Sequence, residues 1–136
     1  MIYSVSTLQS VADCDEMLSS ANNDKAALTV KQTNLQFAQT RYQANSVELA
    51  QELPAVQAEL DATNTIIATL PDGPRKNGFI YDRRKLENRL QLLNTKKASY
   101  GSLALLDKEW ELARVVHDLA EVDALIAAVN ARKAAL

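Results

Sequence analysis

The chain has 136 residues, of which 47% are hydrophobic but only 5% aromatic, and its formal net charge is -2. Alanine, leucine and long polar residues dominate over three glycines and three prolines, a composition typical of helices and not of disordered chains. The charge offers no general attraction to nucleic acid or anionic membranes, and no stretch approaches the roughly 18 consecutive apolar residues of a membrane span.

The amino-terminal residues contain neither the basic region nor the apolar core of a secretory signal, so we predict no such signal and a cytoplasmic protein. The length of 136 residues predicts a single domain. Ser6-Thr7-Leu8-Gln9 matches a capping box, and we expect the first helix to begin near residue 4. The single cysteine, Cys14, excludes an intramolecular disulfide and a multi-cysteine metal site.

A heptad register follows from Val11 to Leu70 and predicts a long helix that packs lengthwise on another helix. We call the positions of this register, most of them apolar, the first seam: Val11, Cys14, Leu18, Ala21, Lys25, Leu28, Gln32, Leu35, Gln39, Tyr42, Ser46, Leu49, Leu53, Val56, Leu60, Thr63, Ile67 and Leu70. Within this predicted helix, two segments contain residues that disfavour a helix interior. Residues 20–24 are rich in capping residues, so the helix either ends there or continues, as the unbroken register favours; Pro54 predicts a kink.

Residues 71–79 combine two prolines, two glycines and two turn-forming dipeptides, and they predict a loop. A second helix should follow over about residues 80–136. Residues 43–72 carry five acidic and no basic side chains, whereas residues 75–97 carry eight basic and two acidic ones. Folding back across the loop sets opposite charges alongside one another, so we predict an all-α fold, a long antiparallel coiled-coil hairpin.

The second helix should be interrupted near Gly101, because the apolar register slips there. The register before it passes through Leu86, Leu90, Leu93, Lys97 and Tyr100; the register after it, the C-terminal seam, passes through Leu105, Lys108, Leu112, Val115, Leu119, Val122, Ile126, Val129, Lys133 and Leu136. A second apolar line, beginning with Leu106, Trp110, Ala113 and His117, runs beside the C-terminal seam. Two adjacent lines indicate two partner helices.

The second partner is either residues 4–21 folded back, which would make a local three-helix bundle, or another copy of the chain. A two-helix hairpin has a small core for its length, which favours self-association. We therefore expect a homo-oligomer or a helical protein partner, with Leu106, Trp110, Ala113 and His117 as interface candidates.

No catalytic or ligand motif stands out. His117 is the only histidine and lacks a recognisable nucleophile, no histidine or cysteine pair has metal-ligand spacing, and Gly73 and Gly78 follow no strand that would make a phosphate loop. Cys14 is expected to be a small buried apolar residue. We predict no enzymatic activity, metal, cofactor or small-molecule substrate.

The one alternative is a basic tip around residues 75–97. Arg75, Lys76, Arg83, Arg84 and Lys85 occur with Phe79 and Tyr81, and basic and aromatic side chains together bind phosphates and stack on bases. The simpler interpretation is that these basic side chains complement the acidic side chains of the helix that packs alongside. The sequence thus favours a coiled-coil interaction or scaffold module over a nucleic-acid-binding arm, and nucleic acid is not the expected partner.

Overall fold

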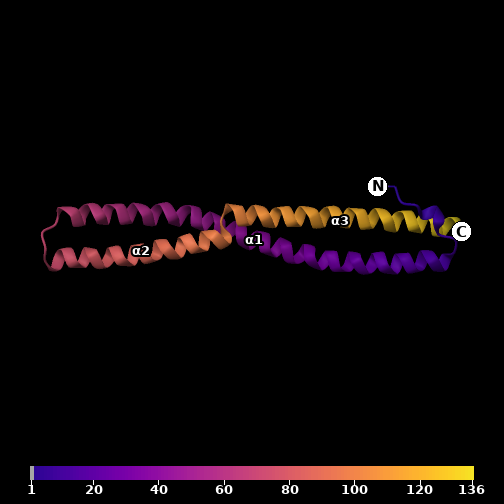
Figure 1. The fold of residues 1–136 in the computed structure, drawn as a ribbon, viewed down its shortest axis with the longest axis horizontal. Coiled ribbons are helices and arrows are strands. Elements are labelled where there is room, and N and C mark those ends of the chain that lie inside the picture. The colour runs from indigo at the N-terminus through magenta and orange to yellow at the C-terminus, as the bar shows by residue number, and fades with distance from the viewer. Residues whose placement is uncertain (1) are drawn as a thin grey trace. The chain divides into compact units, whose positions relative to one another are not determined.

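A computed structural model describes residues 2–136 and is helical almost throughout (Figure 1). Its elements are the 3-10 turn η1 (Val5–Thr7), α1 (Val11–Thr69), α2 (Pro74–Tyr100) and α3 (Ser102–Ala135), with no strand in the part described. The chain divides into two compact units. Unit 1 combines the described residues up to Ala38 with Lys108–Leu136, and unit 2 is Gln39–Asp107. In each unit a part of α1 packs against the returning chain, so the predicted all-α hairpin is confirmed.

The first seam faces the returning chain along the whole of α1. Of its predicted positions only Val11 is exposed, and the others are buried or half-buried. The most buried are Cys14, Ala21 and Leu35 in unit 1, and Leu49, Leu60 and Ile67 in unit 2. The helix is unbroken through residues 20–24 and contains Pro54, as continuity of the register favoured.

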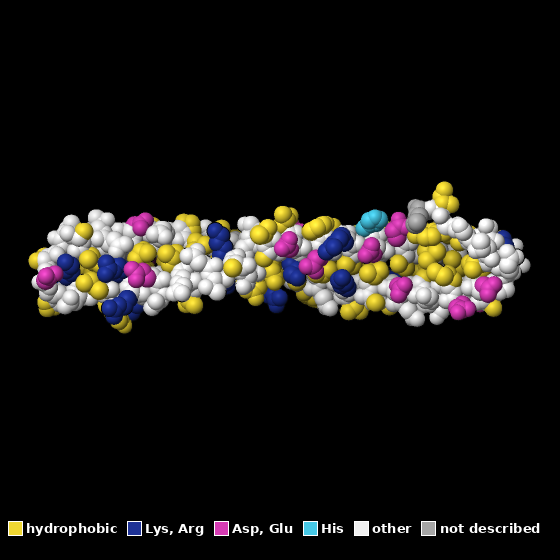
Figure 2. Space-filling model, in the orientation of Figure 1, with side chains coloured by type: hydrophobic (Ala, Val, Ile, Leu, Met, Phe, Trp, Pro, Cys, Tyr) yellow, Lys and Arg dark blue, Asp and Glu magenta, His cyan; other side chains and the backbone are white. Residues whose placement is uncertain are grey.

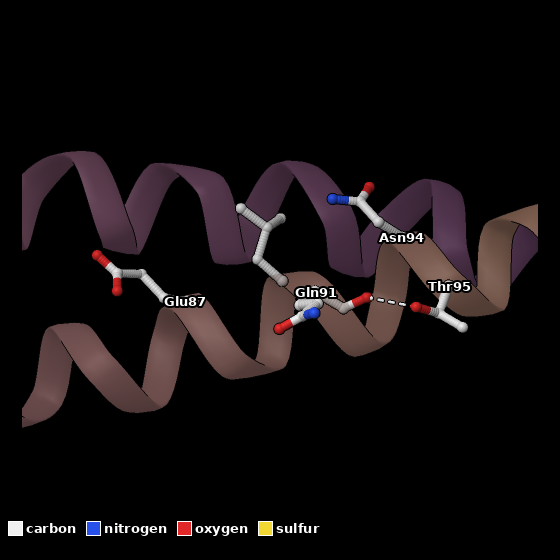
Figure 3. Close-up of a pocket in the computed structure, with 5 residues that line it drawn as sticks. Glu87, Gln91, Asn94 and Thr95 are labelled. Atoms are coloured by element: carbon white, nitrogen blue, oxygen red, sulfur yellow. Dashed lines mark hydrogen bonds between the residues drawn. The ribbon is translucent and has the colours of Figure 1, made fainter.

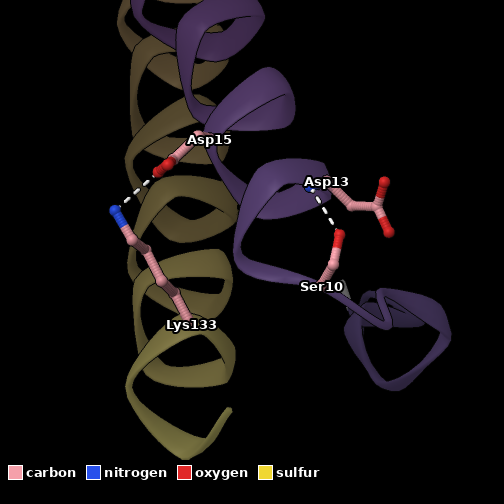
Figure 4. A network of polar contacts seen from close by, with 4 residues as sticks. All are labelled: Ser10, Asp13, Asp15 and Lys133. Atoms are coloured by element: carbon pink, nitrogen blue, oxygen red, sulfur yellow. Dashed lines mark hydrogen bonds and ion pairs between the residues drawn. The ribbon is translucent and has the colours of Figure 1, made fainter.

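The amino-terminal helix boundary differs from the prediction. Residues Ser6–Gln9 form no capping box, because η1 ends at Thr7 and the long helix begins only at Val11. The cap is Ser10, whose Oγ accepts a hydrogen bond of 3.1 Å from the backbone N–H of Asp13 (Figure 4). A serine hydroxyl in this position satisfies one of the donors left open at a helix start. The sequence pattern placed this helix cap at Ser6, four residues before the serine that provides it.

The predicted loop over residues 71–79 is also too long. The connection spans only Leu70–Gly73, and α2 begins at Pro74. Proline suits the first position of a helix, because its fixed φ is helical and its missing N–H donor would have no intrahelical acceptor there. The reversal falls on Gly73, whose φ of 155° is the one positive value among the described residues. Gly78 is accommodated within the helix.

Gly101 interrupts the returning chain, as the register slip predicted. α2 ends at Tyr100, and the N–H of Gly101 donates to the carbonyl oxygen of Lys97 at 2.7 Å. A β-carbon at Gly101 would lie 2.4 Å from that oxygen, so the position requires glycine. Lys97 itself is exposed, which corrects its place in the predicted register; Lys96 is half-buried instead.

In unit 2, α2 lies antiparallel to the second part of α1. Leu93 is almost fully buried, and the rings of Tyr42 and Tyr100 meet edge to face with centroids 4.9 Å apart. The expected charge complementarity between the helices is realised by an ion pair between Arg89 and Glu52. Antiparallel pairing explains why residues so distant in sequence meet.

In unit 1, α3 lies antiparallel to the first part of α1. The C-terminal seam residues within this unit are not exposed, apart from the terminal Leu136, and Val115 and Val129 are the most buried. Two ion pairs fix the alignment: Lys25 Nζ lies 2.7 Å from Asp123 Oδ1, and Lys133 Nζ lies 2.5 Å from Asp15 Oδ1 (Figure 4). Over the described residues, no helix is long and apolar enough to cross a membrane.

Candidate interaction surface

The most distinctive surface of unit 1 is an exposed line of side chains on α3, directed away from α1. We call it the outer stripe: Trp110, Ala113, His117, Ala120, Ala124 and Ala127. Its members recur at intervals of three and four residues, which places them on one face of the helix. All are exposed, and Trp110 is 64% exposed. Leu106, the remaining predicted interface residue, belongs to unit 2 and is 59% exposed.

An exposed tryptophan is the unusual member of this stripe, because large aromatic side chains normally contribute to a core or an interface. One face of Trp110 is partly covered by Arg114, whose guanidinium carbon lies 4.9 Å from the ring centroid. Such a cation–π contact holds the ring in place at a small energetic gain. Figure 2 shows hydrophobic side chains exposed among charged ones on one face of the chain.

The amino-terminal segment does not cover the outer stripe. It lies on a neighbouring side of α3, where Tyr3, Val5 and Leu8 line a small apolar depression together with Leu125 and Val129. The predicted folding back of residues 4–21 is therefore limited to the turn η1 and its flanks, since the remainder of that range belongs to α1. Within unit 1, nothing described packs on the stripe.

Two hydrogen bonds hold this segment on α3. The Tyr3 hydroxyl donates to Glu121 Oε2 at 2.7 Å, and Arg132 Nε donates to the carbonyl oxygen of Leu8 at 3.1 Å. The bond from Tyr3 lowers the pKa of Glu121, and it raises the pKa of Tyr3 itself. Sequence reasoning missed these residues, because no local pattern links positions 118 residues apart.

Known proteins give no guide to this surface. No protein-family model, curated protein or solved structure matches the chain. What the chain does must therefore be inferred from its own residues.

The polar chemistry near the stripe does not form a catalytic arrangement. His117 is exposed, and its neighbour Glu121 is engaged by Tyr3. A general base needs a positioned proton donor or nucleophile within hydrogen-bond reach. Residues 2–136 contain no cluster of histidine, cysteine, aspartate and glutamate able to hold a metal ion, and Cys14 is fully buried in the first seam.

The basic residues near the loop do not all lie on one side of α2. Arg75 and Arg84 are nine residues apart on α2, about half a turn out of phase. Lys76 and Arg83 lie on the side that faces α1, and each pairs with an acid close in sequence, at 3.2 Å to Asp72 and 3.7 Å to Glu87.

The two aromatic residues of the tip differ in exposure. Phe79 is half-buried on the side of α2 that faces α1. Lys85 Nζ lies 4.6 Å from the centroid of the Tyr81 ring, and Tyr81 remains 59% exposed. Single-stranded nucleic acid is held by a basic groove with several open aromatic faces, whereas the tip exposes one aromatic ring.

The remaining depressions are shallow. One on α2 is lined by Glu87, Leu90, Gln91, Asn94 and Thr95, all on a single helix, and the Thr95 hydroxyl donates to the Gln91 carbonyl within it (Figure 3). Another lies in unit 2, where Pro54 and Gly101 disturb the packing of their helices. The first is lined by one helix alone, and the second is lined chiefly by apolar residues together with Ser46, Lys97 and Ser102.

Proposed function

We propose that the chain is a non-enzymatic helical interaction module that associates with further copies of itself through the outer stripe of α3. The observation that carries the proposal is the 64% exposure of Trp110 at the end of an exposed, alanine-lined helix face. Exposed contiguous apolar surface of this kind usually marks an interface, and tryptophan is prominent among residues that dominate binding energy.

The architecture supports the proposal in two further ways. Each seam is only two helices wide, so few side chains are deeply buried, and association adds the core that a thin hairpin lacks. In addition, the alanines of the stripe allow a second helix to approach closely. A module of this type works by holding copies, and whatever each copy carries, at a fixed separation.

The test is sedimentation equilibrium of the unmodified chain and of Trp110→Glu. A charge placed within the proposed apolar contact is expected to shift the chain from oligomer to monomer, with the helical circular dichroism unchanged. Phe37→Glu is the matched control, because Phe37 is 74% exposed on α1 of the same unit, on the side away from α3. Equal effects of both substitutions would overturn the assignment of the stripe.

A further inference from the structure

The amino-terminal segment Ile2–Gln9, which we call the strap, is a self-contained piece of unit 1. Its backbone hydrogen bonds are the two within the turn η1, each of 3.1 Å. Those of α1 begin with the bond from the N–H of Cys14 to the carbonyl oxygen of Ser10. No described hydrogen bond crosses from the strap to α1, so rotation at the link between Gln9 and Ser10 releases the strap without breaking either element.

The strap is held on α3 by a regular pattern of its own residues (Figure 1). Tyr3, Val5 and Leu8 are half-buried, and the remaining residues of the strap are exposed. Both ends of the pattern are anchored by hydrogen bonds, from the Tyr3 hydroxyl to Glu121 at 2.7 Å and from Arg132 to the Leu8 carbonyl at 3.1 Å. The two anchors are eleven residues apart, which places them on one face of α3.

The groove beneath the strap is apolar and is not filled by it. Met17 of α1 lines the groove together with Leu125 and Val129 of α3, and an open depression of about 210 Å³ remains between these residues and the strap. A second depression, of about 380 Å³, adjoins Leu8 and Met17. Segments that belong to a core are close-packed and leave little such space. A terminal segment with few buried contacts opens locally at a small cost in free energy.

We propose that this groove is a binding site for extended segments with the pattern of the strap, and that the strap of a second copy is its ligand. The pattern is a tyrosine followed by aliphatic residues two and five positions later. Exchange of straps between copies conserves the contacts with the groove, because the two chains have the same sequence. The inference goes beyond the proposed function, since it does not involve the outer stripe.

The copy's own strap then acts as a competing ligand. A segment joined by a short link has an effective concentration on the order of 1 mM at its own site. A strap supplied by another chain enters when the resident strap is displaced or when the copies are already held close together. The groove is therefore masked in an isolated chain and becomes available to a second copy on association.

The test separates the strap from the groove in two full-length variants. The receptor, Val5→Asp with Leu8→Asp, loses the apolar contacts of its strap and keeps the groove. The donor, Glu121→Ala with Arg132→Ala, keeps its strap and lacks both hydrogen-bond partners. The methyl signals of Leu125 and Val129 in the isotope-labelled receptor are followed by nuclear magnetic resonance. They are expected to move toward their positions in the unmodified chain as donor is added to about 1 mM.

Unlabelled receptor is the matched control, because it carries the same outer stripe but no competent strap. Signals that stay in place with the donor, or that move equally with the control, would overturn the proposal. A synthetic peptide of residues 2–9 supplies the strap independently of how the donor folds. It is expected to move the same signals, and Tyr3→Phe in the peptide is expected to raise its dissociation constant about fivefold.

A peptide that leaves the signals in place at about 1 mM, or that binds the unmodified chain as tightly as the receptor, would also overturn the proposal. In the second case the peptide does not compete with the resident strap and binds elsewhere. The outer stripe is tested separately by the mass of the unmodified chain and of Trp110→Glu. Failure of strap exchange therefore leaves self-association standing, and a monomeric chain leaves the groove standing.

Discussion

Two adjacent leucines of α2 provide a direct test of how the hairpin is held together. Leu93 is 2% exposed and Leu92 is 64% exposed, so Leu93→Ala and Leu92→Ala make the same chemical change on the same helix in opposite environments. Both substitutions exchange one good helix former for another, which leaves helix propensity nearly unchanged. Any difference in the free energy of unfolding therefore reports burial.

The magnitude follows from the buried groups. Truncating leucine to alanine removes about three methylene equivalents, or roughly 2.4 kcal/mol of transfer free energy, and the cavity left behind adds to this. Because a two-helix seam can partly close over a cavity, we expect Leu93→Ala to lower the free energy of unfolding by about 3 kcal/mol. Leu92→Ala should cost less than about 1 kcal/mol.

Urea denaturation followed by far-ultraviolet circular dichroism measures both values, provided that the dependence on urea is unchanged. Protein concentration must be held constant, since association adds to apparent stability. If the free energies of unfolding of the two variants differ by less than about 1 kcal/mol, Leu93 does not contribute to the packing of α2 against α1, and the packing described for unit 2 is wrong.

The remaining predictions concern two glycines and the amino-terminal segment. Gly101→Ala should lower the free energy of unfolding by about 1–3 kcal/mol in the same assay, because its β-carbon would meet a backbone oxygen at 2.4 Å. Gly78→Ala, in open space within a helix, should instead raise the free energy of unfolding by about 0.5–1 kcal/mol. A stabilised Gly101→Ala would contradict the close approach. Tyr3→Phe should raise the pKa of Glu121 toward its ordinary value in a titration followed by nuclear magnetic resonance, because the hydrogen bond that lowers it is lost. Since a lowered carboxyl pKa stabilises the folded state above the unfolded pKa, the contact should weaken as the pH falls below about 4.3, and an unchanged pKa in Tyr3→Phe would refute this role.

The long-range pattern of the chain was predictable because it depends on local periodicity. The first seam from Cys14 to Leu70 is inaccessible or half-buried as expected, and the interruption at Gly101 was visible as a slip in register. These features repeat every seven residues, so many positions support the same conclusion. The prediction failed at Lys97, four residues before Gly101, where Lys96 is half-buried instead.

Helix boundaries were harder to predict because several signals competed. Ser6 and Ser10 are both residues of a type that caps a helix amino terminus. The structure uses Ser10, directly before α1 begins at Val11. At the turn, the two prolines and two glycines all suggested a loop, yet Pro74 begins a helix and Gly78 is tolerated within one. Local propensity leaves such choices open by a few residues.

The candidate surface was partly predictable. Trp110, Ala113 and His117 were identified from their spacing beside the C-terminal seam, and the structure leaves all three exposed. The bond between Tyr3 and Glu121 could not be predicted, because it joins the two ends of the chain through tertiary packing alone. Periodicity finds the faces of a helix, but it does not say which face a non-helical segment will occupy.

The central claim is that this chain associates with itself, and its mass in solution tests that claim most directly. Sedimentation equilibrium over a wide range of concentrations should show a rise from the 15.0 kDa of a single chain to twice that value, reversible on dilution. A mass that stays at 15.0 kDa up to the highest concentration at which the chain remains dissolved would contradict the account.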